Sequence, residues 1–164
     1  MPVEVSTDEV GTTGWMHHVP AVERLATQCL VALDKADHEL SVMLTDDEHI
    51  RVLNRDYREE DEPTDVLSFC QLEGDPFVSP VPMLGDLVIS VETAERQALE
   101  MGHPLAAELR ILLVHGVLHL VGFDHIEAHD RVAMAKAEDE LLERLPAVPE
   151  WPTTTGLIAR AGGT

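Results

Sequence analysis

Three histidines lie close together in residues 115–125, which read HGVLHLVGFDH. Residues four apart on an α-helix lie on the same face, so His115 and His119 would point the same way, one turn apart. Gly122 then permits a turn that a residue with a Cβ would resist, and this turn can bring His125 back toward the pair. Three imidazoles with one open position are typical of a catalytic zinc site, whereas structural zinc sites fill all four positions. The spacing therefore favours a zinc centre that does chemistry.

The helix that would carry His115 and His119 is apolar on nearly every side. Leucine and valine occupy most positions between residues 105 and 121, a pattern typical of a buried helix. Imidazoles inside such a helix need polar partners, because burying a polar group without one is costly. A bound metal ion would satisfy both rings. The alternative is that the two histidines only form hydrogen bonds with the backbone or with water.

The remaining histidines are weaker candidates for metal ligands. Five of them lie among polar or acidic residues or in a Gly-His-Pro turn, and we predict that they are solvated: His17, His18, His38, His49 and His103. His129 stands four residues after His125 and could replace it as the third ligand. We favour His125, because residues 127–144 are predicted to form a new helix that carries His129 outward.

Composition limits the class of protein. A chain of 164 residues with 45% hydrophobic residues predicts a single domain over 1–145, followed over 146–164 by a flexible tail rich in Pro, Thr and Gly. The two cysteines are too few for a disulfide framework and fit a reducing, cytoplasmic compartment. No apolar run approaches the ~20 residues of a membrane span, and the first residues do not resemble a secretory signal. We therefore expect no membrane partner.

The formal net charge of −20 argues against binding nucleic acid through overall attraction. A polyanionic substrate would need a local positive feature. Arg51, Arg55 and Arg58 form a basic stripe on one face of a predicted helix. We expect Arg51 and Arg55 to be solvated and paired with Glu59, Asp61 or Glu62. Arg58 lies at the helix end beside Pro63, where a loop can present it to a cleft.

The hydrophobic periodicity alternates between extended and helical segments, which predicts an α/β or α+β domain. Strands are expected over residues 3–5, 40–44, 66–69 and 84–91. Helices are expected over residues 20–35, 45–57, 92–101, 105–121 and 127–144. The histidine pair would thus lie on the fourth helix, and the third histidine on the turn that follows it.

Four segments carry a resemblance to a known family. They are Leu53-Asn54 with Tyr57-Arg58, PTDVLSF over 63–69, LGDLVIS over 84–90, and the histidine segment 115–125. In their residue types and order they resemble the YbeY family of bacterial endoribonucleases, over about residues 40–142. The resemblance implies an α+β, zincin-like fold, in which a small mixed β-sheet packs with helices and the metal site lies on a buried helix and the following turn. One departure is Cys70, where the family usually has proline.

The resemblance also implies site residues and a function. His115, His119 and His125 would bind one zinc ion per chain, and Arg58 and His115 would be the catalytic residues. The activity implied is a zinc-dependent, single-strand-specific endoribonuclease. It would act in maturation of ribosomal RNA, notably at the 3′ end of the small-subunit RNA, and in ribosome quality control. The implied partners are single-stranded RNA, ribosomal RNA and proteins of the small ribosomal subunit, with the chain itself expected to be a monomer.

The chemistry of these residues agrees with RNA cleavage. Zinc polarises phosphoryl oxygens and acidifies water, while an arginine fork neutralises charge on the transition state. The nucleophile can be water or the adjacent ribose 2′-hydroxyl. We expect Asp124 and Asp86 to accept hydrogen bonds from the outer nitrogens of the histidines.

Two other functions use the same three histidines. Zinc peptidases with this histidine spacing usually have glutamate directly after the first histidine as general base, but this chain has Gly116 there. A non-catalytic, zinc-stabilised ribosome-assembly factor would require a fourth protein ligand.

Overall fold

A four-stranded mixed sheet lies at the centre of the computed structural model, which describes residues 3–7, 18–70, 83–123 and 127–145. The strands lie in the order β1-β2-β4-β3. Their bounds are Val3–Thr7 for β1, Glu39–Thr45 for β2, Val66–Cys70 for β3 and Met83–Ser90 for β4. The first three in that order run parallel, and β3 pairs antiparallel with β4 at the edge. The predicted class, α+β with a small mixed sheet, is confirmed.

Five helices connect and cover these strands. Their bounds are Val19–Ala32 for α1, Asp47–Arg58 for α2, Val91–Met101 for α3, Leu105–Leu120 for α4 and Ala128–Arg144 for α5. All lie where the periodicity predicted helices, and their ends differ by a few residues at most. Helix α1 ends earlier than predicted, and Asp34 shortly beyond it takes a left-handed φ of 59° that cannot continue a helix. The predicted tail, 146–164, lies outside the described residues.

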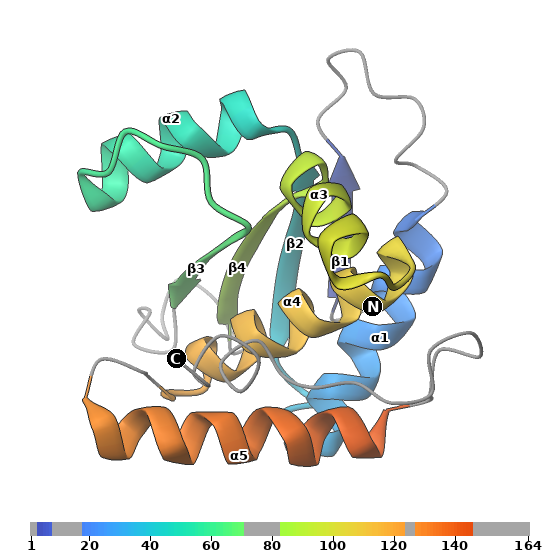
Figure 1. The fold of residues 1–164 in the computed structure, drawn as a ribbon. Coiled ribbons are helices and arrows are strands. Elements are labelled where there is room, and N and C mark those ends of the chain that lie inside the picture. The colour runs from blue at the N-terminus through green and yellow to red at the C-terminus, as the bar shows by residue number, and fades with distance from the viewer. Residues whose placement is uncertain (1–2, 8–17, 71–82, 124–126, 146–164) are drawn as a thin grey trace.

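Helix α2 covers one face of the sheet, and α1, α4 and α5 lie on the other (Figure 1). A small cluster under α2 consists of Ile50, Leu67 and Val88, with Leu53 and Phe69 packed against it. The large core on the opposite face joins α1, α4 and α5 to β2 and β4. Successive residues of a strand point to opposite faces, so β3 and β4 contribute side chains to both cores.

Helix α4 lies between the sheet and α5 (Figure 1) and is buried without a break from Ala107 to Leu118. This confirms the prediction of a buried helix. Gly116 faces the sheet: a Cβ there would lie 2.7 Å from Cδ2 of Leu87 and 3.3 Å from Cγ2 of Val66. The missing side chain therefore permits the helix backbone to approach β3 and β4 closely. Among the described residues, no helix combines the length and apolar character needed to cross a bilayer.

The first residue of α2 is bonded to the start of α3. The carboxylate of Asp47 accepts hydrogen bonds from Ser90 Oγ at 2.6 Å, Thr93 Oγ1 at 2.5 Å and Arg96 Nη2 at 2.7 Å. Partial burial alone would raise the pKa of Asp47, but these three hydrogen bonds outweigh it and hold the pKa below the ordinary value of 3.8. The network therefore fixes the N-terminal end of α2 over the sheet.

We expect Asp47→Ala to lower the free energy of unfolding at pH 7 by about 1 to 3 kcal/mol, because three donors lose a charged partner. Since folding lowers this pKa, the stabilisation is complete above the ordinary pKa and is lost as the pH falls through the folded value. The difference between variant and parent should therefore narrow below about pH 4. Urea unfolding of both proteins at pH 7 and at pH 3 measures this difference in the free energy of unfolding.

The control is Asp56→Ala, which removes an exposed carboxylate of the same helix that bonds only to Arg55 among the described residues. It should change the free energy of unfolding by less than about 0.5 kcal/mol. If the difference in free energy of unfolding between Asp47→Ala and the parent were the same at pH 7 and pH 3, it would contradict the stabilising role given to the Asp47 carboxylate.

Candidate functional site

The rings of His115 and His119 contact each other on one face of α4. Their centroids lie 4.7 Å apart and the ring planes meet at 81°. The same-face prediction from their spacing is therefore confirmed. His115 is buried, whereas His119 near the helix end is partly exposed. The pair thus extends from the core toward the solvent, as expected for ligands of an ion that a substrate must reach.

The chain turns sharply after His119. Gly122 has a φ of +108°, a conformation that residues with a Cβ rarely adopt. The amide of Gly122 donates to the His119 carbonyl at 3.1 Å, and that of Phe123 donates to the Leu118 carbonyl at 3.0 Å. These two bonds form a Schellman motif, which ends the helix and reverses the chain. The turn predicted at Gly122 is confirmed.

The third ligand stays a prediction, because His125 lies outside the described residues. In the part of the chain that the structure describes, no group of three His, Cys, Asp or Glu side chains is placed to hold a metal ion. The alternative ligand, His129, lies in the first turn of α5. Its side chain is 83% exposed and contacts Asp130 at 3.3 Å, so its predicted outward direction is confirmed.

A buried glutamate on α5 orients His115. Oε2 of Glu138 lies 3.2 Å from Nδ1 of His115, and the Glu138 side chain is fully buried. A carboxylate at Nδ1 fixes the ring, so that Nε2 is the nitrogen that would bind a metal. Such carboxylate–histidine pairs raise the basicity of a metal-binding imidazole. The residues present therefore fit a metal ion on this face of α4.

The sequence interpretation missed Glu138, although a signal for it exists. Met134, Glu138, Leu141 and Leu142 share the buried face of α5 at helical spacing, which makes Glu138 an acidic residue within an apolar stripe. The partners predicted instead were Asp124 and Asp86. Asp124 lies outside the described residues, so its role remains a prediction. Asp86 pairs with Phe69 on the face of the sheet that α2 covers, whereas a Cβ on the neighbouring Gly85 would meet Leu120 of α4. Asp86 therefore faces away from the histidine helix, and the prediction for it was wrong.

A buried arginine holds α5 against α4. Arg110 donates to the carbonyl oxygens of Leu142 at 2.5 Å and Leu145 at 3.1 Å. These carbonyls belong to the C-terminal end of α5, where the backbone lacks partners within the helix. Because Glu138 lies one turn before this anchor, Arg110 helps to set its position behind His115.

Arg58 is the last residue of α2 and reaches the edge strand β3. Its Nη2 donates to the Ser68 carbonyl at 3.1 Å. Ser68 Oγ in turn donates to the carbonyl of Gly116 at 3.3 Å. Two hydrogen bonds thus connect Arg58, across one strand, to the residue that follows His115.

The arginines of α2 differ in their partners. Arg51 pairs with Glu48 at 2.7 Å and with Asp61, and Arg55 pairs with Asp56 at 3.1 Å. This confirms the predicted pairing of Arg51 with Asp61, whereas Arg55 pairs with Asp56 and not with one of the predicted partners. Arg58 is exposed, and its hydrogen bond among the described residues is to a neutral carbonyl. Its positive charge is therefore available to an anionic ligand.

The prediction for His103 was wrong. Its ring is buried, with Nε2 2.7 Å from Oε1 of the buried Glu108. Gly102 takes a left-handed φ of 73° at the end of α3, and the turn directs the ring toward the first turns of α4. His103 lies in a turn that looks polar in the sequence, but it is buried with Glu108 because helix α4 packs over the turn. His38 was also predicted to be solvated, but its side chain is only 15% exposed.

Comparisons with known proteins place the chain in a family. A sequence model described as Endoribonuclease YbeY matches residues 8–146. The chain belongs to the YbeY family. Endoribonuclease YbeY of Heliobacterium modesticaldum is 46% identical over 142 residues, which cover 79% of this chain and 84% of the relative. The enzyme of the same name from Picosynechococcus is 42% identical over 147 residues, covering 86% and 88%.

A solved structure supports the fold assignment. A Thermotoga maritima protein, determined in solution, superposes with a TM-score of 0.54 over 87% of each chain, at 24% sequence identity. This likeness concerns the fold alone.

We expect Glu138→Gln to bind Zn²⁺ about 10- to 100-fold more weakly than the parent, because outer partners of a metal-binding histidine contribute this much to affinity and a neutral amide holds the His115 ring less firmly than a carboxylate. The amide oxygen still accepts a hydrogen bond, so the fold should be retained. Competition with a chelating dye measures the affinity, and circular dichroism checks the fold. Glu140→Gln is the matched control, since Glu140 is a 61% exposed neighbour that pairs with Lys136. Equal affinity in both variants would contradict the role of Glu138.

Proposed function

We propose that this chain is a zinc-dependent endoribonuclease that cuts single-stranded RNA during maturation of ribosomal RNA. It would process the 3′ end of the small-subunit RNA and would also act in ribosome quality control. The relatives that match it carry the name endoribonuclease. The observation that carries the proposal is the His115–His119 pair, backed by buried Glu138 and connected through β3 to Arg58.

The proposed zinc ligands are His115, His119 and His125. Neutral imidazoles are common zinc ligands, and three of them leave a position open for a reacting group. When bound, the ion supplies a Lewis acid that polarises phosphoryl oxygens. The carboxylate of Glu138 holds the His115 ring in the orientation required for binding through Nε2.

Arg58 would hold the reacting phosphate. A guanidinium carries five N–H donors in a rigid fork, and among the described residues one hydrogen bond of Arg58 goes to the Ser68 carbonyl. That bond fixes the group at the edge of β3 while other donors remain able to bind phosphoryl oxygens. In a protein with a formal charge of −20, a guanidinium at the sheet edge with no carboxylate partner among the described residues is a place where a phosphate can bind.

The position of Gly116 argues against a peptidase. A Cβ at residue 116 would point at Leu87 and Val66 of the sheet. The residue after His115 therefore faces the core, where a general base could not reach a substrate. This geometry favours phosphodiester cleavage, with either water or the ribose 2′-hydroxyl as nucleophile.

We expect protein purified without added metal to contain one zinc per chain, and His119→Ala to contain far less. The reason is that removing one of three ligands leaves too few donors for tight binding. Elemental analysis measures the content. The matched control is His129→Ala, since this exposed histidine points outward and its variant should keep its zinc. Equal zinc in His119→Ala and the parent would reject the ligand assignment.

We expect Arg58→Ala to cut the hydrolysis of single-stranded RNA about 100- to 1,000-fold, the usual cost of losing a transition-state contact of ~2.7 to 4 kcal/mol. Melting temperature and zinc content should hardly change, because the side chain is exposed. Arg58→Lys should restore only part of the activity, since it keeps the charge but loses the fork.

The control for this experiment is Arg55→Ala, which removes an exposed arginine from the same helix. It should cleave RNA at nearly the parent rate. Casein serves as a peptidase substrate. If Arg58→Ala cleaved RNA at the parent rate, Arg58 would have no role in cleavage. If the parent cleaved casein and not RNA, the proposed function would be overturned.

A further inference from the structure

Tyr57, the residue before Arg58, is an exposed aromatic side chain. It is 69% exposed, and it is the sole aromatic among the large hydrophobic side chains exposed in the described part of the chain. Leaving an aromatic ring in water gives up the free energy that its burial would provide. Aromatic rings and positive charge together are the features with which proteins bind single-stranded nucleic acid.

The Tyr57 ring is held in place without being covered. Its centroid lies 5.4 Å from that of Phe69, at an angle of 73°. This edge-to-face contact is a favourable aromatic geometry. Phe69 itself packs against the cluster under α2. The contact therefore restrains the tyrosine while much of its surface remains exposed.

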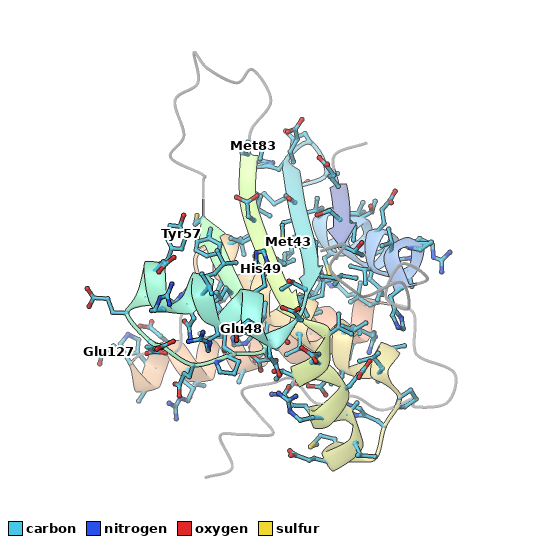
Figure 2. The ribbon with its side chains drawn as sticks, turned by 90° about the horizontal axis from the view of Figure 1, so that it is seen from above. Met43, Glu48, His49, Tyr57, Met83 and Glu127 are labelled. Carbon is cyan, nitrogen blue, oxygen red and sulfur yellow. The ribbon has the colours of Figure 1, made fainter. Side chains whose placement is uncertain are left out.

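The edge strand β3 contacts Tyr57 on one face and the histidine helix on the other. Ser68 and Cys70 direct their side chains to α4, where they bond to the carbonyls of Gly116 and Leu120. Phe69, between them, points to the opposite face and contacts Tyr57. In Figure 2 Tyr57 lies beside β3, at the edge of the sheet. The ring and the histidine helix are thus joined to the same short strand.

We propose that Tyr57 and Arg58 form a subsite for one nucleotide of a single-stranded RNA. The Tyr57 ring stacks on the base, and Arg58 binds the adjoining phosphate. This inference rests on the proposed cleavage of RNA and adds a residue that positions the substrate. Every base has a π face, so stacking accepts any sequence. A base inside a duplex is already stacked and paired, so the subsite selects single strands.

The charge of the protein makes this contact important. Most nucleic-acid binding gains affinity from neutralising many phosphates, and a net charge of −20 denies this chain that contribution. Stacking does not depend on net charge. A stacked base is therefore a means by which an acidic protein can retain an RNA strand beside a single guanidinium.

The test compares Tyr57→Ala with RNAs that lack one base. Each single-stranded oligonucleotide in a set carries one abasic nucleotide, at a different position beside the cleavage site. The value of kcat/KM is measured for every oligonucleotide. With the parent, one position should lower kcat/KM by about 5- to 150-fold, the equivalent of ~1 to 3 kcal/mol for one stacked base. Tyr57→Ala should cleave intact RNA with kcat/KM lowered by the same factor relative to the parent. An abasic nucleotide at that position should then lower kcat/KM of Tyr57→Ala no further.

Two variants separate stacking from other effects. Tyr57→Phe keeps the ring and should cleave like the parent. Leu99→Ala removes an 84% exposed apolar side chain from α3 and should also cleave like the parent. Melting temperature and zinc content should be unchanged in all three variants.

The results distinguish the subsite from the function it rests on. If the parent cleaves RNA but every abasic position lowers kcat/KM equally in the parent and in Tyr57→Ala, the subsite is rejected and the proposed function stands. If the parent cleaves none of the RNAs, the proposed function itself falls, and the subsite with it.

Discussion

The close contact between helix α4 and the sheet at Gly116 sets how the histidine helix lies against β3 and β4. At this point the helix has no side chain, and Leu87 and Val66 fill the space that a Cβ would need. Because the helix is pressed against the sheet on this side, His115 and its neighbour one turn later occupy other sides of the helix. The same approach brings the Gly116 carbonyl within reach of Ser68. A larger residue here would move the histidines away from β3.

Because α4 is buried, its polar side chains need hydrogen-bonding or charged partners, and the surrounding elements provide them. Polar groups buried without partners are destabilising, so each polar residue of this helix needs one. Glu108 has His103 from the preceding turn, Arg110 has carbonyls at the end of α5, and His115 has Glu138. These contacts also fix α5 and the α3–α4 turn in place. The polar residues of the core therefore specify the packing of the helix that carries the site.

Strand β3 connects the two faces of the molecule. Its residues alternate between the histidine helix and α2, and its Ser68 carbonyl receives Arg58. The network around Asp47 fixes the opposite end of α2. Helix α2 is thus held at both ends, which places its last two residues at the sheet edge. An acidic protein thereby displays, at this edge of the sheet, a cation that no carboxylate among the described residues neutralises.

The local features of this protein could be predicted from its sequence, because they depend on short-range periodicity and conformational preference. The spacing of His115 and His119 predicts a shared helix face, Gly122 predicts a turn, and the apolar residues of 105–121 predict burial. Each of these was confirmed. Arg51 was also correctly predicted to pair with Asp61, which lies nearby in the sequence.

Tertiary structure decided the partners that come from distant segments. Glu138 lies 23 positions after His115, and nothing in either local pattern indicates that the two would meet. The burial of His103 depends on how α4 packs over its turn, and the bond of Arg58 to Ser68 depends on β3 lying under the end of α2. Periodicity shows which face of an element is buried, but only the assembled fold determines which element covers that face.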